Sequence, residues 1–407
     1  MDSPQQPIGW EQALARRTKA NAGEGLSSIL ALGGRTDLIS FAGGFPDPST
    51  FPRAEVAEIT ERLAASGDHS AWQYSPTAGL PGPRSYLQER LETFEGRAPE
   101  EGELIITSGV IEALELLGKS LLEAEDLAFV EGPTYLGAIM AFQSFEARVE
   151  SAPMDADGLS IDELEAQIER CGKPKLLYTI PDHQNPAGIT MTLERRERLV
   201  EVARRDEFLI IEDVAYRELG FTEDRLPSLW SLAPDVVLQA GTFSKTFFPG
   251  VRLGWGVGPA AIVKSMIWAK QNTDQGAGAF GQRLLEEYGR SGGLEQQAKA
   301  ARVLYSRRCE LMMAALDAHM PEGITWTEPE GGFFTWLRLP DGVDGTEVAR
   351  RAAAEGVAIV PGAPFFPSEG GIRNIRLAYS IVPDASIDEG IKRLASVIAA
   401  ETERTGR

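Results

Sequence analysis

The sequence is poor in cysteine and histidine, two of the side chains that most often hold transition metals. Its 407 residues include two cysteines, Cys171 and Cys309, and three histidines. The cysteines are far apart and form no C-x-x-C pair, which argues against a metal knuckle, a redox pair and an oxidising compartment. The histidines show no metal-ligand spacing. We therefore expect no metal site.

Long hydrophobic runs and an excess of positive charge are also lacking. No stretch of about 18 apolar residues occurs, and the N-terminus has no apolar segment after a basic start. The 60 acidic residues outnumber the 40 basic ones, and the resulting charge of −20 repels phosphodiester backbones and anionic lipid. We expect a cytoplasmic protein with no nucleic-acid partner and no membrane partner.

The rest of the composition is that of a soluble globular protein, with 43% hydrophobic and 25% charged residues. From residue 104 to about residue 256, short apolar runs alternate with longer amphipathic segments. This alternation predicts an α/β fold in which helices cover a largely parallel sheet. Ligands of such sheets bind beyond the carboxyl ends of the strands. The expected strands lie at 104–107, 127–131, 176–180, 208–213, 236–241 and 253–258.

The remainder of the chain reads differently from this central region. Gly- and Pro-rich loops precede it, and an extended apolar segment between helices follows it. We expect an N-terminal arm that forms part of a small domain (1–50), a large cofactor-binding domain (51–305) and a small C-terminal α+β domain (306–407).

Lysine is scarce, and one of the nine lysines has unusual surroundings. Lys245 directly follows an expected strand in GTFSKTFFPGVRLGW, after the hydroxyl residues Thr242 and Ser244 and ahead of Arg252. A lysine amine can form an imine with an aldehyde cofactor, while hydroxyls and a guanidinium bind a phosphate. Taken alone, the motif favours a solvated loop lysine, and four further motifs reverse that preference.

Four further motifs stand at strand ends. ITSGVIEAL places Ser108 and Gly109 where a helix begins, so that backbone N–H groups face a phosphate. NPAG and IIEDVAY supply an amide, a carboxylate and a phenol suited to a protonated ring and its hydroxyl. RNIRLAYS places an arginine in an apolar strand, suited to a substrate carboxylate. The side chains concerned are Asn185, Asp213, Tyr216 and Arg376.

The order of these motifs resembles that of the fold-type I pyridoxal phosphate enzymes, in particular the class I/II aminotransferases that include 2-aminoadipate and kynurenine aminotransferases. The resemblance covers nearly the whole chain, from RTDLISFAGGFPDPSTFP to RLAYS. It implies a large domain with a mostly parallel seven-stranded sheet covered by helices, and a smaller α+β domain built from both chain ends. It also implies pyridoxal 5'-phosphate as the cofactor.

The resemblance implies a role for each motif residue. Lys245 would be the Schiff-base lysine and proton shuttle, and Asp213 would keep the ring nitrogen protonated. Asn185 and Tyr216 would bond the ring oxygen, and Tyr135 in EGPTY would stack on the ring. The phosphate would be held by Ser108, Gly109, Val110, Ile111, Thr242, Ser244 and Arg252.

The substrate and a second subunit enter through the same resemblance. Arg376 would bind the α-carboxylate of the amino acid, with Gly44 and Asn185 close to it. Tyr74 of the partner subunit would reach the phosphate across an interface, which implies a homodimer. The small-molecule partners would be an amino acid and a 2-oxo acid.

Several positions depart from the family pattern. Val110 and Ile111 stand where a hydroxyl residue and a glutamine are usual, so side-chain phosphate contacts are lost there. His183 replaces an aromatic residue, and we favour a packing role over a second acid/base. Ser27 stands where 2-aminoadipate-type relatives tend to carry an arginine, which argues against a dicarboxylate substrate. Phe45, Phe247 and Phe248 are expected either to pack in the core or to crowd the pocket.

Three functions compete on this evidence. The leading one is transamination of an apolar, aromatic or 2-aminoadipate-like amino acid with a 2-oxo acid acceptor. The second keeps the cofactor but carries out elimination, replacement, cyclisation or oxidation, and the unusual residues at 110, 111 and 183 motivate it. The third is a cofactor-sensing regulator, which the short N-terminal segment and the negative charge disfavour.

Overall fold

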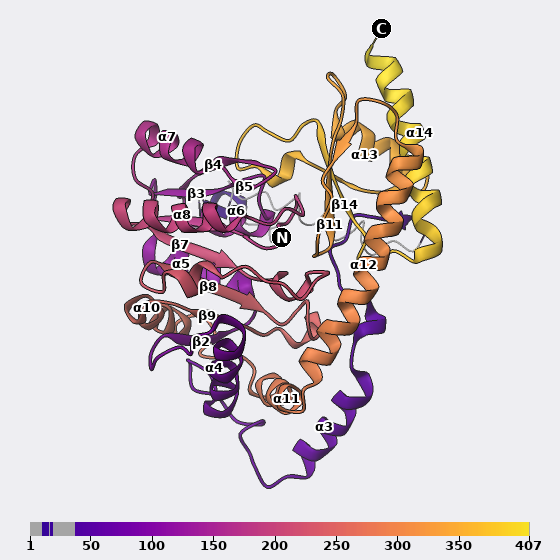
Figure 1. The fold of residues 1–407 in the computed structure, drawn as a ribbon. Helices are drawn as coiled ribbons and strands as arrows, with labels where there is room; N and C mark the ends of the chain where they lie inside the picture. Colours follow the sequence, from indigo (N-terminus) through magenta and orange to yellow (C-terminus); the bar gives the residue numbers. More distant parts are fainter. Residues whose placement is uncertain (1–9, 16, 19–36, 407) are drawn as a thin grey trace, which may run out of the picture.

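A computed structural model describes residues 10–15, 17–18 and 37–406 of the chain. Its centre is an eight-stranded sheet, the large sheet, with the order β2-β9-β8-β7-β6-β3-β4-β5. Figure 1 shows helices on both sides of this sheet. The strands are β2 (Leu104–Thr107), β3 (Leu127–Gly132), β4 (Arg148–Asp155), β5 (Gly158–Leu159), β6 (Leu176–Thr179), β7 (Leu209–Asp213), β8 (Val237–Thr242) and β9 (Gly254–Val257).

The predicted α/β arrangement with a mostly parallel sheet is confirmed, and the one difference in the large sheet is its number of strands. Strands β4, β3, β6, β7 and β8 run parallel, whereas β9 is antiparallel to both of its neighbours. The sheet has eight strands instead of seven, because the short β5 extends its edge through a hairpin with β4. Strand β4 is absent from the prediction because its exposed and buried positions follow no clean alternation.

Two apolar layers cover the two faces of the large sheet. Alternate residues of each central strand enter different layers, as Tyr178 and Leu177 do on β6. Helices α5 (Val110–Leu121), α6 (Leu136–Gln143) and α10 (Ala260–Gln271) cover one face. The other face packs against α4 (Pro81–Glu95), α7 (Ile161–Cys171), α8 (Leu193–Asp206), α9 (Leu229–Leu232) and α11 (Ala279–Arg290), and α3 (Arg53–Ala65) adjoins this layer.

A four-stranded antiparallel sheet, the small sheet, lies beside the large one. Its strand order is β10-β11-β14-β13, and the early strand β1 (Ile39–Ser40) pairs with β12 (Val357–Ala358) next to it. An early segment and the C-terminal part of the chain therefore meet here. The other elements are β10 (Thr325–Trp326), β11 (Phe334–Arg338), β13 (Val360–Pro361), β14 (Asn374–Ala378), α12 (Gly293–His319), α13 (Gly345–Ala354) and α14 (Asp384–Thr405).

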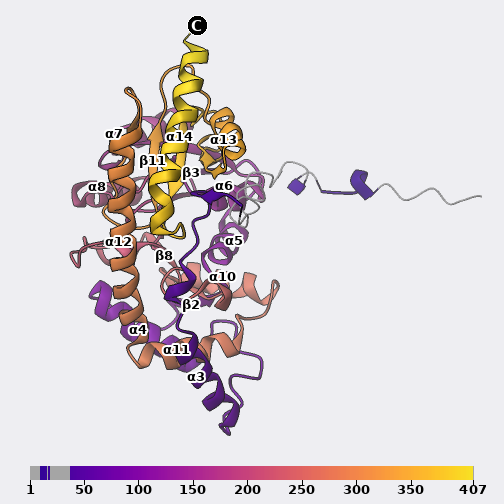
Figure 2. The ribbon, with the colours of Figure 1, turned by 90° about the vertical axis from the view of Figure 1, so that its right-hand side faces the viewer.

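The long helix α12 connects the two sheets. Figure 2 shows it running beside α14, against which it packs. One end of α12 follows α11 under the large sheet, and the other end leads into β10. This helix therefore holds the small sheet against the carboxyl edge of the large one.

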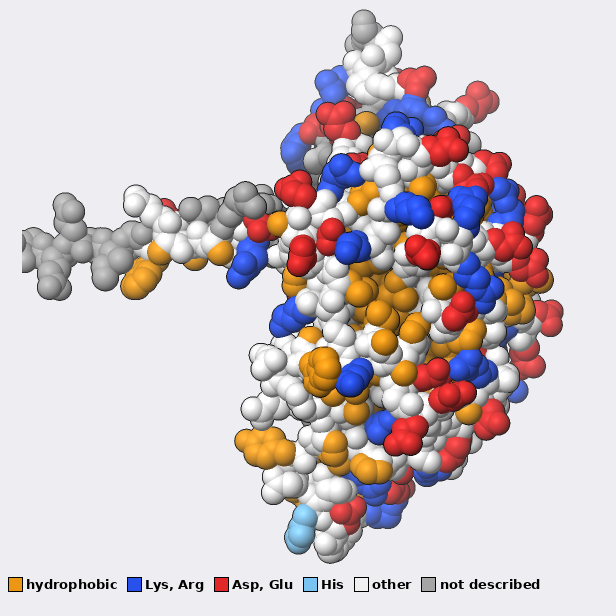
Figure 3. All heavy atoms as spheres, turned by 90° about the vertical axis from the view of Figure 1, so that its left-hand side faces the viewer, with side chains coloured by type: hydrophobic (Ala, Val, Ile, Leu, Met, Phe, Trp, Pro, Cys, Tyr) orange, Lys and Arg blue, Asp and Glu red, His pale blue; other side chains and the backbone are white. Residues whose placement is uncertain are grey.

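The surface carries charges of both signs. On the face drawn in Figure 3, Lys and Arg side chains alternate with Asp and Glu and surround scattered hydrophobic groups. In the part of the chain that the structure describes, no helix is both long enough and apolar enough to span a bilayer. No cluster of metal-ligating side chains occurs among these residues either.

Candidate active site

A cavity of about 250 Å³ lies at the carboxyl ends of β6, β7 and β8, where the small sheet closes over them. Twelve of the fifteen residues expected at the site line it, and Ser108, Gly109 and Tyr74 do not. The parallel strands of the large sheet end at a common edge, so residues far apart in the sequence meet here. The twelve are Gly44, Val110, Ile111, Tyr135, Asn185, Asp213, Tyr216, Thr242, Ser244, Lys245, Arg252 and Arg376.

Lys245 lies in the turn that follows β8 and points its amine into the cavity. Its Nζ donates a hydrogen bond to the carbonyl oxygen of Gly44 at 2.8 Å. Burial lowers the pKa of Lys245 to about 8, and the positive charges of Arg376 and Arg252 act in the same direction. Lys245 is therefore a lysine that is partly neutral near physiological pH and can act as a base or a nucleophile.

Asp213 ends β7 and has one hydrogen-bond donor on each carboxylate oxygen. The hydroxyl of Tyr178 donates to Oδ2 at 2.7 Å, and the N–H of Ala215 donates to Oδ1 at 3.0 Å. Burial raises the pKa of Asp213 to about 6, while Tyr178, Ala215 and the nearby Lys245 oppose that rise. Each oxygen keeps a second acceptor position for a ligand.

Arg376 is a buried guanidinium held between two aromatic rings. Its Cζ lies 4.3 Å from the ring centre of Phe334 and 4.9 Å from that of Phe365. Nη2 donates to the carbonyl oxygen of Ala42 at 2.7 Å and Nη1 to Oδ1 of Asn185 at 2.9 Å. Burial lowers the pKa of Arg376 to about 10.

The buried Nε of Arg376 has no hydrogen-bond partner. An unpaired donor on a buried cation is costly, and a ligand carboxylate in the cavity would satisfy it. The bond to Arg376 also orients the amide of Asn185, because an oxygen that accepts from the guanidinium leaves Nδ2 free to donate elsewhere.

A second polar cluster surrounds Arg252 at the start of α5. Nη1 of Arg252 donates to Oγ of Ser244 at 3.3 Å, and the hydroxyl of Thr242 donates to the same Oγ at 3.0 Å. Gly109 has φ 97°, and a Cβ there would lie 2.9 Å from Nη2 of Arg252. A side chain at this position would fill the space in which the first turn of α5 presents its N–H groups.

One predicted donor of this cluster is already paired. Oε2 of Glu112 accepts from the N–H of Ser108 at 2.6 Å, so that N–H is not free for a phosphate as the sequence motif suggested. Glu112 in turn pairs with Lys270, whose side chain is fully buried. The donors that remain come from Arg252, Thr242, Ser244 and the first turn of α5.

The side walls of the cavity are largely apolar. Phe45 lines the cavity, which is one of the two places that the sequence analysis allowed for it. Phe334, Phe365 and Leu136 also line the cavity, although no sequence motif indicated them. Tyr135 packs close to Ile111, since a Cβ on Gly137 would touch both side chains. Phe247 and Phe248 lie elsewhere: the ring of Phe247 stacks on Tyr288 at 4.9 Å in the core.

His183 also lies outside the cavity. Its side chain is buried, with the residue only 8% exposed, and it packs against Gly220, Gly331 and Gly332, where any Cβ would lie within 3 Å of it. Nδ1 is 3.3 Å from Oγ1 of Thr190. Burial lowers the pKa of His183 to about 4, so the ring is neutral. This geometry supports the packing role. Ser27 lies outside the described residues.

Glu131 and Gln184 brace the two loops that carry Tyr135 and Asn185. Glu131 is buried at the end of β3 and accepts from Thr179, from the N–H of Ile180 and from Nε2 of Gln184. Nε2 of Gln184 also donates to the carbonyl oxygen of Pro133 at 2.7 Å. Burial raises the pKa of Glu131 to about 7.

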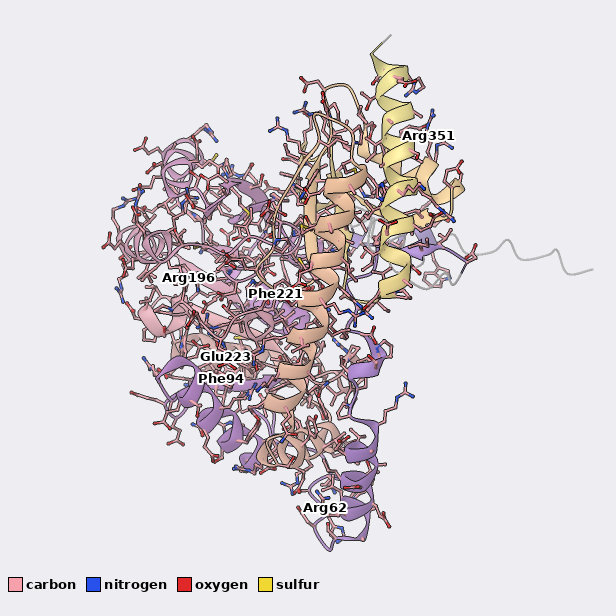
Figure 4. The ribbon with its side chains drawn as sticks, turned by 45° about the vertical axis from the view of Figure 1, so that its right-hand side comes forward. Arg62, Phe94, Arg196, Phe221, Glu223 and Arg351 are labelled. Atoms are coloured by element: carbon pink, nitrogen blue, oxygen red, sulfur yellow. The ribbon has the colours of Figure 1, made fainter. Side chains whose placement is uncertain are left out.

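A buried ion-pair network lies next to the loop that carries Asn185. Asp182 binds Nη2 of Arg196 at 2.7 Å and Nη1 of Arg217 at 2.9 Å, and Arg217 also binds Glu95. Arg196 is labelled in Figure 4 and comes from α8 with no exposed surface. These paired charges hold the loop in place, and none of their side chains lines the cavity.

The family described as Aminotransferase class I and II matches residues 36–394. The chain is similar to aromatic-amino-acid aminotransferase 1 of Thermococcus litoralis, at 35% identity over 98% of this chain and 96% of that protein. It is also similar to the structure of Pyrococcus horikoshii kynurenine aminotransferase in complex with PMP, with a TM-score of 0.93 and 36% identity over 97% of this chain and 98% of that one.

A third similarity is to alpha-aminoadipate aminotransferase LysN of Thermus thermophilus, solved with N-(5'-phosphopyridoxyl)-L-leucine. The TM-score is 0.90 and the identity 33%, and the match covers 98% of this chain and all of that chain.

Proposed function

The chain belongs to the aminotransferase class I and II family, and on that premise we propose that it uses pyridoxal 5'-phosphate to move the amino group of an apolar or aromatic amino acid to a 2-oxo acid. The observation that carries this proposal is the cavity. It joins a lysine of lowered pKa, a buried carboxylate and an unsatisfied arginine within apolar walls.

The donor set fits the proposed cofactor. An aldehyde requires an amine, which Lys245 provides, and a phosphate requires the cation and hydroxyls that surround Arg252. A protonated ring nitrogen requires a carboxylate with open acceptor positions, as Asp213 has. When bound, the cofactor supplies an electron sink for the electron pair that remains when the substrate Cα loses its proton.

Each side chain of the cavity has a separate role in the proposed reaction. Arg376 would bind the substrate carboxylate through Nε and its remaining Nη hydrogens, which orients the Cα–H. Lys245, held by Gly44, would accept the Cα proton, and with a pKa of about 8 roughly one tenth of it is neutral at pH 7. Asn185 and Tyr216 would donate to the ring oxygen.

The substrate class follows from the charges that line the cavity. Its cations among the described residues are Lys245, Arg252 and Arg376, and each has a role in the proposal above. No further cation lines the described walls to receive a distal carboxylate, while Phe45 and Phe365 offer apolar contact. A dicarboxylic amino acid would therefore bury an unpaired charge, which is costly.

The test is an amino-acid panel with the monocarboxylic acid pyruvate as acceptor and 2-oxo acid formation measured by mass spectrometry. We expect phenylalanine and leucine to exceed 2-aminoadipate in kcat/KM by at least about tenfold, because burial of an unpaired charge is costly. The δ-amide of 2-aminoadipate is a control matched in shape, and it should be the better substrate of the two.

Two results of this panel would contradict the proposal. A preference for 2-aminoadipate over its amide would overturn the substrate class. Consumption of the amino acid without an equivalent of 2-oxo acid would overturn transamination and favour elimination, replacement, cyclisation or oxidation.

We further propose that the protein is a homodimer in which Tyr74 of one subunit completes the site of the other. Tyr74 is 87% exposed and lies in a groove of about 790 Å³. Trp72 beside it is 57% exposed and packs against Phe280 at 5.5 Å. Exposed aromatic groups of this size favour burial by another protein surface.

Mixed dimers test this arrangement. We expect a Tyr74→Ala subunit paired with a Lys245→Ala subunit to be more active than either homodimer, because one of its two sites then has both side chains. Differently tagged subunits and tandem affinity purification isolate the mixed dimer. Activity no higher than half that of the Tyr74→Ala homodimer would place both side chains in the same subunit and contradict the proposal.

A further inference from the structure

Tyr178 is the one side chain, among the described residues, that donates to Asp213 from outside the cavity wall. It lies on β6, the strand between β7 and β3, and its side chain is fully buried. Its ring makes an edge contact with Phe142 at 6.3 Å. The hydroxyl points at Oδ2 of Asp213 across the gap between two neighbouring parallel strands.

The carboxylate of Asp213 has few other supports. Oδ1 is held by the backbone N–H of Ala215, and no salt bridge to Asp213 occurs among the described residues. Lys245 acts on Asp213 through its charge without a hydrogen bond. The phenol of Tyr178 is therefore the only described side chain that both orients this carboxylate and stabilises its charged form.

We propose that Tyr178 is a positioning residue that holds Asp213 ionised and in place, and through it keeps the proton on the ring nitrogen of the bound cofactor. The inference rests on the proposed function, since it requires that cofactor. It adds a hydrogen-bonded pair, Tyr178 and Asp213, beneath the surface that the ligand touches.

The direction of the effect follows from the balance at Asp213. Burial raises the pKa of Asp213 to about 6, and the hydrogen bond from Tyr178 opposes this rise. Without the hydroxyl, the carboxylate would hold a proton more strongly and would take it from the ring nitrogen. Burial and the charge of Asp213 raise the pKa of Tyr178 well above its usual value, so the phenol stays a donor at working pH.

Other titratable groups face Asp213 and must be considered with it. Lys245 lowers its pKa, and electrostatic interactions also link it to Glu131, Tyr135 and Tyr216. The tyrosines stay neutral at working pH because burial raises the pKa of Tyr135 to about 12 and raises the pKa of Tyr216 well above its usual value. Only Lys245 and Glu131 therefore titrate near neutrality, and the comparison below is made at one fixed pH.

The test uses Tyr178→Phe, which removes the hydroxyl and keeps the ring in its packing. The protein is loaded with pyridoxal 5'-phosphate carrying ¹⁵N in the ring, and the nitrogen resonance is recorded by NMR. We expect the resonance of the variant to move from the protonated towards the unprotonated position. We also expect kcat to fall about tenfold with little change in KM, the scale of one hydrogen bond to a charged group.

Two controls separate positioning from packing. Phe142→Leu alters the same ring contact without touching the hydrogen bond and should leave the ¹⁵N resonance in place. In an Asp213→Asn background, Tyr178→Phe should have no further effect on that resonance, because the charged partner is gone. Circular dichroism of each apo-protein establishes that it is folded.

The outcomes are distinguishable. An unmoved resonance in folded Tyr178→Phe, or an equal shift in Phe142→Leu, overturns the role of Tyr178 and leaves the proposed function intact. Failure of the wild-type protein to bind pyridoxal 5'-phosphate overturns the proposed function itself.

Discussion

Replacement of Lys245 by alanine is expected to lower kcat by about 10²–10⁴-fold, the contribution typical of a positioned general base. The loss is large because Lys245 is the cavity's amine of lowered pKa. Among the described residues, Asp213 also lines the cavity but is assigned to the ring nitrogen, and His183 lies outside the cavity. Steady-state assays with phenylalanine and pyruvate measure the effect.

The pH dependence and two controls make this prediction specific. The wild-type rate should rise with pH through about 8, since burial lowers the pKa of Lys245 to that value and only the neutral amine accepts a proton. Lys264→Ala, which removes a lysine packed on Trp268 at the surface, should be unaffected. A small added amine should restore part of the activity of Lys245→Ala. A variant that keeps the wild-type rate would refute the assignment.

Most of the site residues that could be predicted from the residues alone lie at the end of a strand or shortly after it. Lys245 and Asp213 follow apolar runs, and the carboxyl ends of parallel strands meet at one edge of a sheet. The sequence therefore shows both the reactive side chain and its place at the carboxyl edge of the sheet. The same reasoning places Arg376 in the cavity only with the help of the family resemblance, because its strand belongs to the other sheet.

The residues that hold these site residues in place could not be predicted, because their contacts depend on which strands are neighbours. Tyr178 lies inside an apolar run and is indistinguishable there from a core aromatic residue. Its partner Asp213 is 35 positions away, and the two meet only because β6 and β7 are neighbours. Glu131 could not be predicted for the same reason, since its hydrogen-bond donors come from the neighbouring strand β6 and the loop after it. Strand order is set by tertiary packing, which single-sequence patterns do not encode.

The three phenylalanines show the same limit. Phe45, Phe247 and Phe248 read alike in the sequence, yet Phe45 lines the cavity whereas the ring of Phe247 stacks on Tyr288. Hydrophobic character predicts that a side chain is buried, and the direction of the backbone decides which space it fills.

Replacement of Arg376 by lysine or leucine has the second-largest expected effect. Removal of one partner from a buried charge pair costs about 3–5 kcal/mol, which corresponds to a loss of roughly one hundredfold to a few thousandfold in kcat/KM for the amino acid. Lysine keeps the charge but not the planar fork, so it should recover only part of the loss. Steady-state kinetics with phenylalanine give both values.

A substrate without a carboxylate separates binding from general damage. Phenethylamine retains the aromatic side chain of phenylalanine but offers Arg376 nothing to bind, so its slow turnover should change little in Arg376→Leu. An equal loss for both compounds would mean that the arginine acts elsewhere. A role of Arg376 away from the carboxylate has a structural basis, since Nη1 of Arg376 also donates to Oδ1 of Asn185 at 2.9 Å. Asn185→Ala therefore completes the comparison: if Arg376 acts mainly on the carboxylate, this variant lowers turnover of both compounds alike, whereas Arg376→Leu discriminates between them.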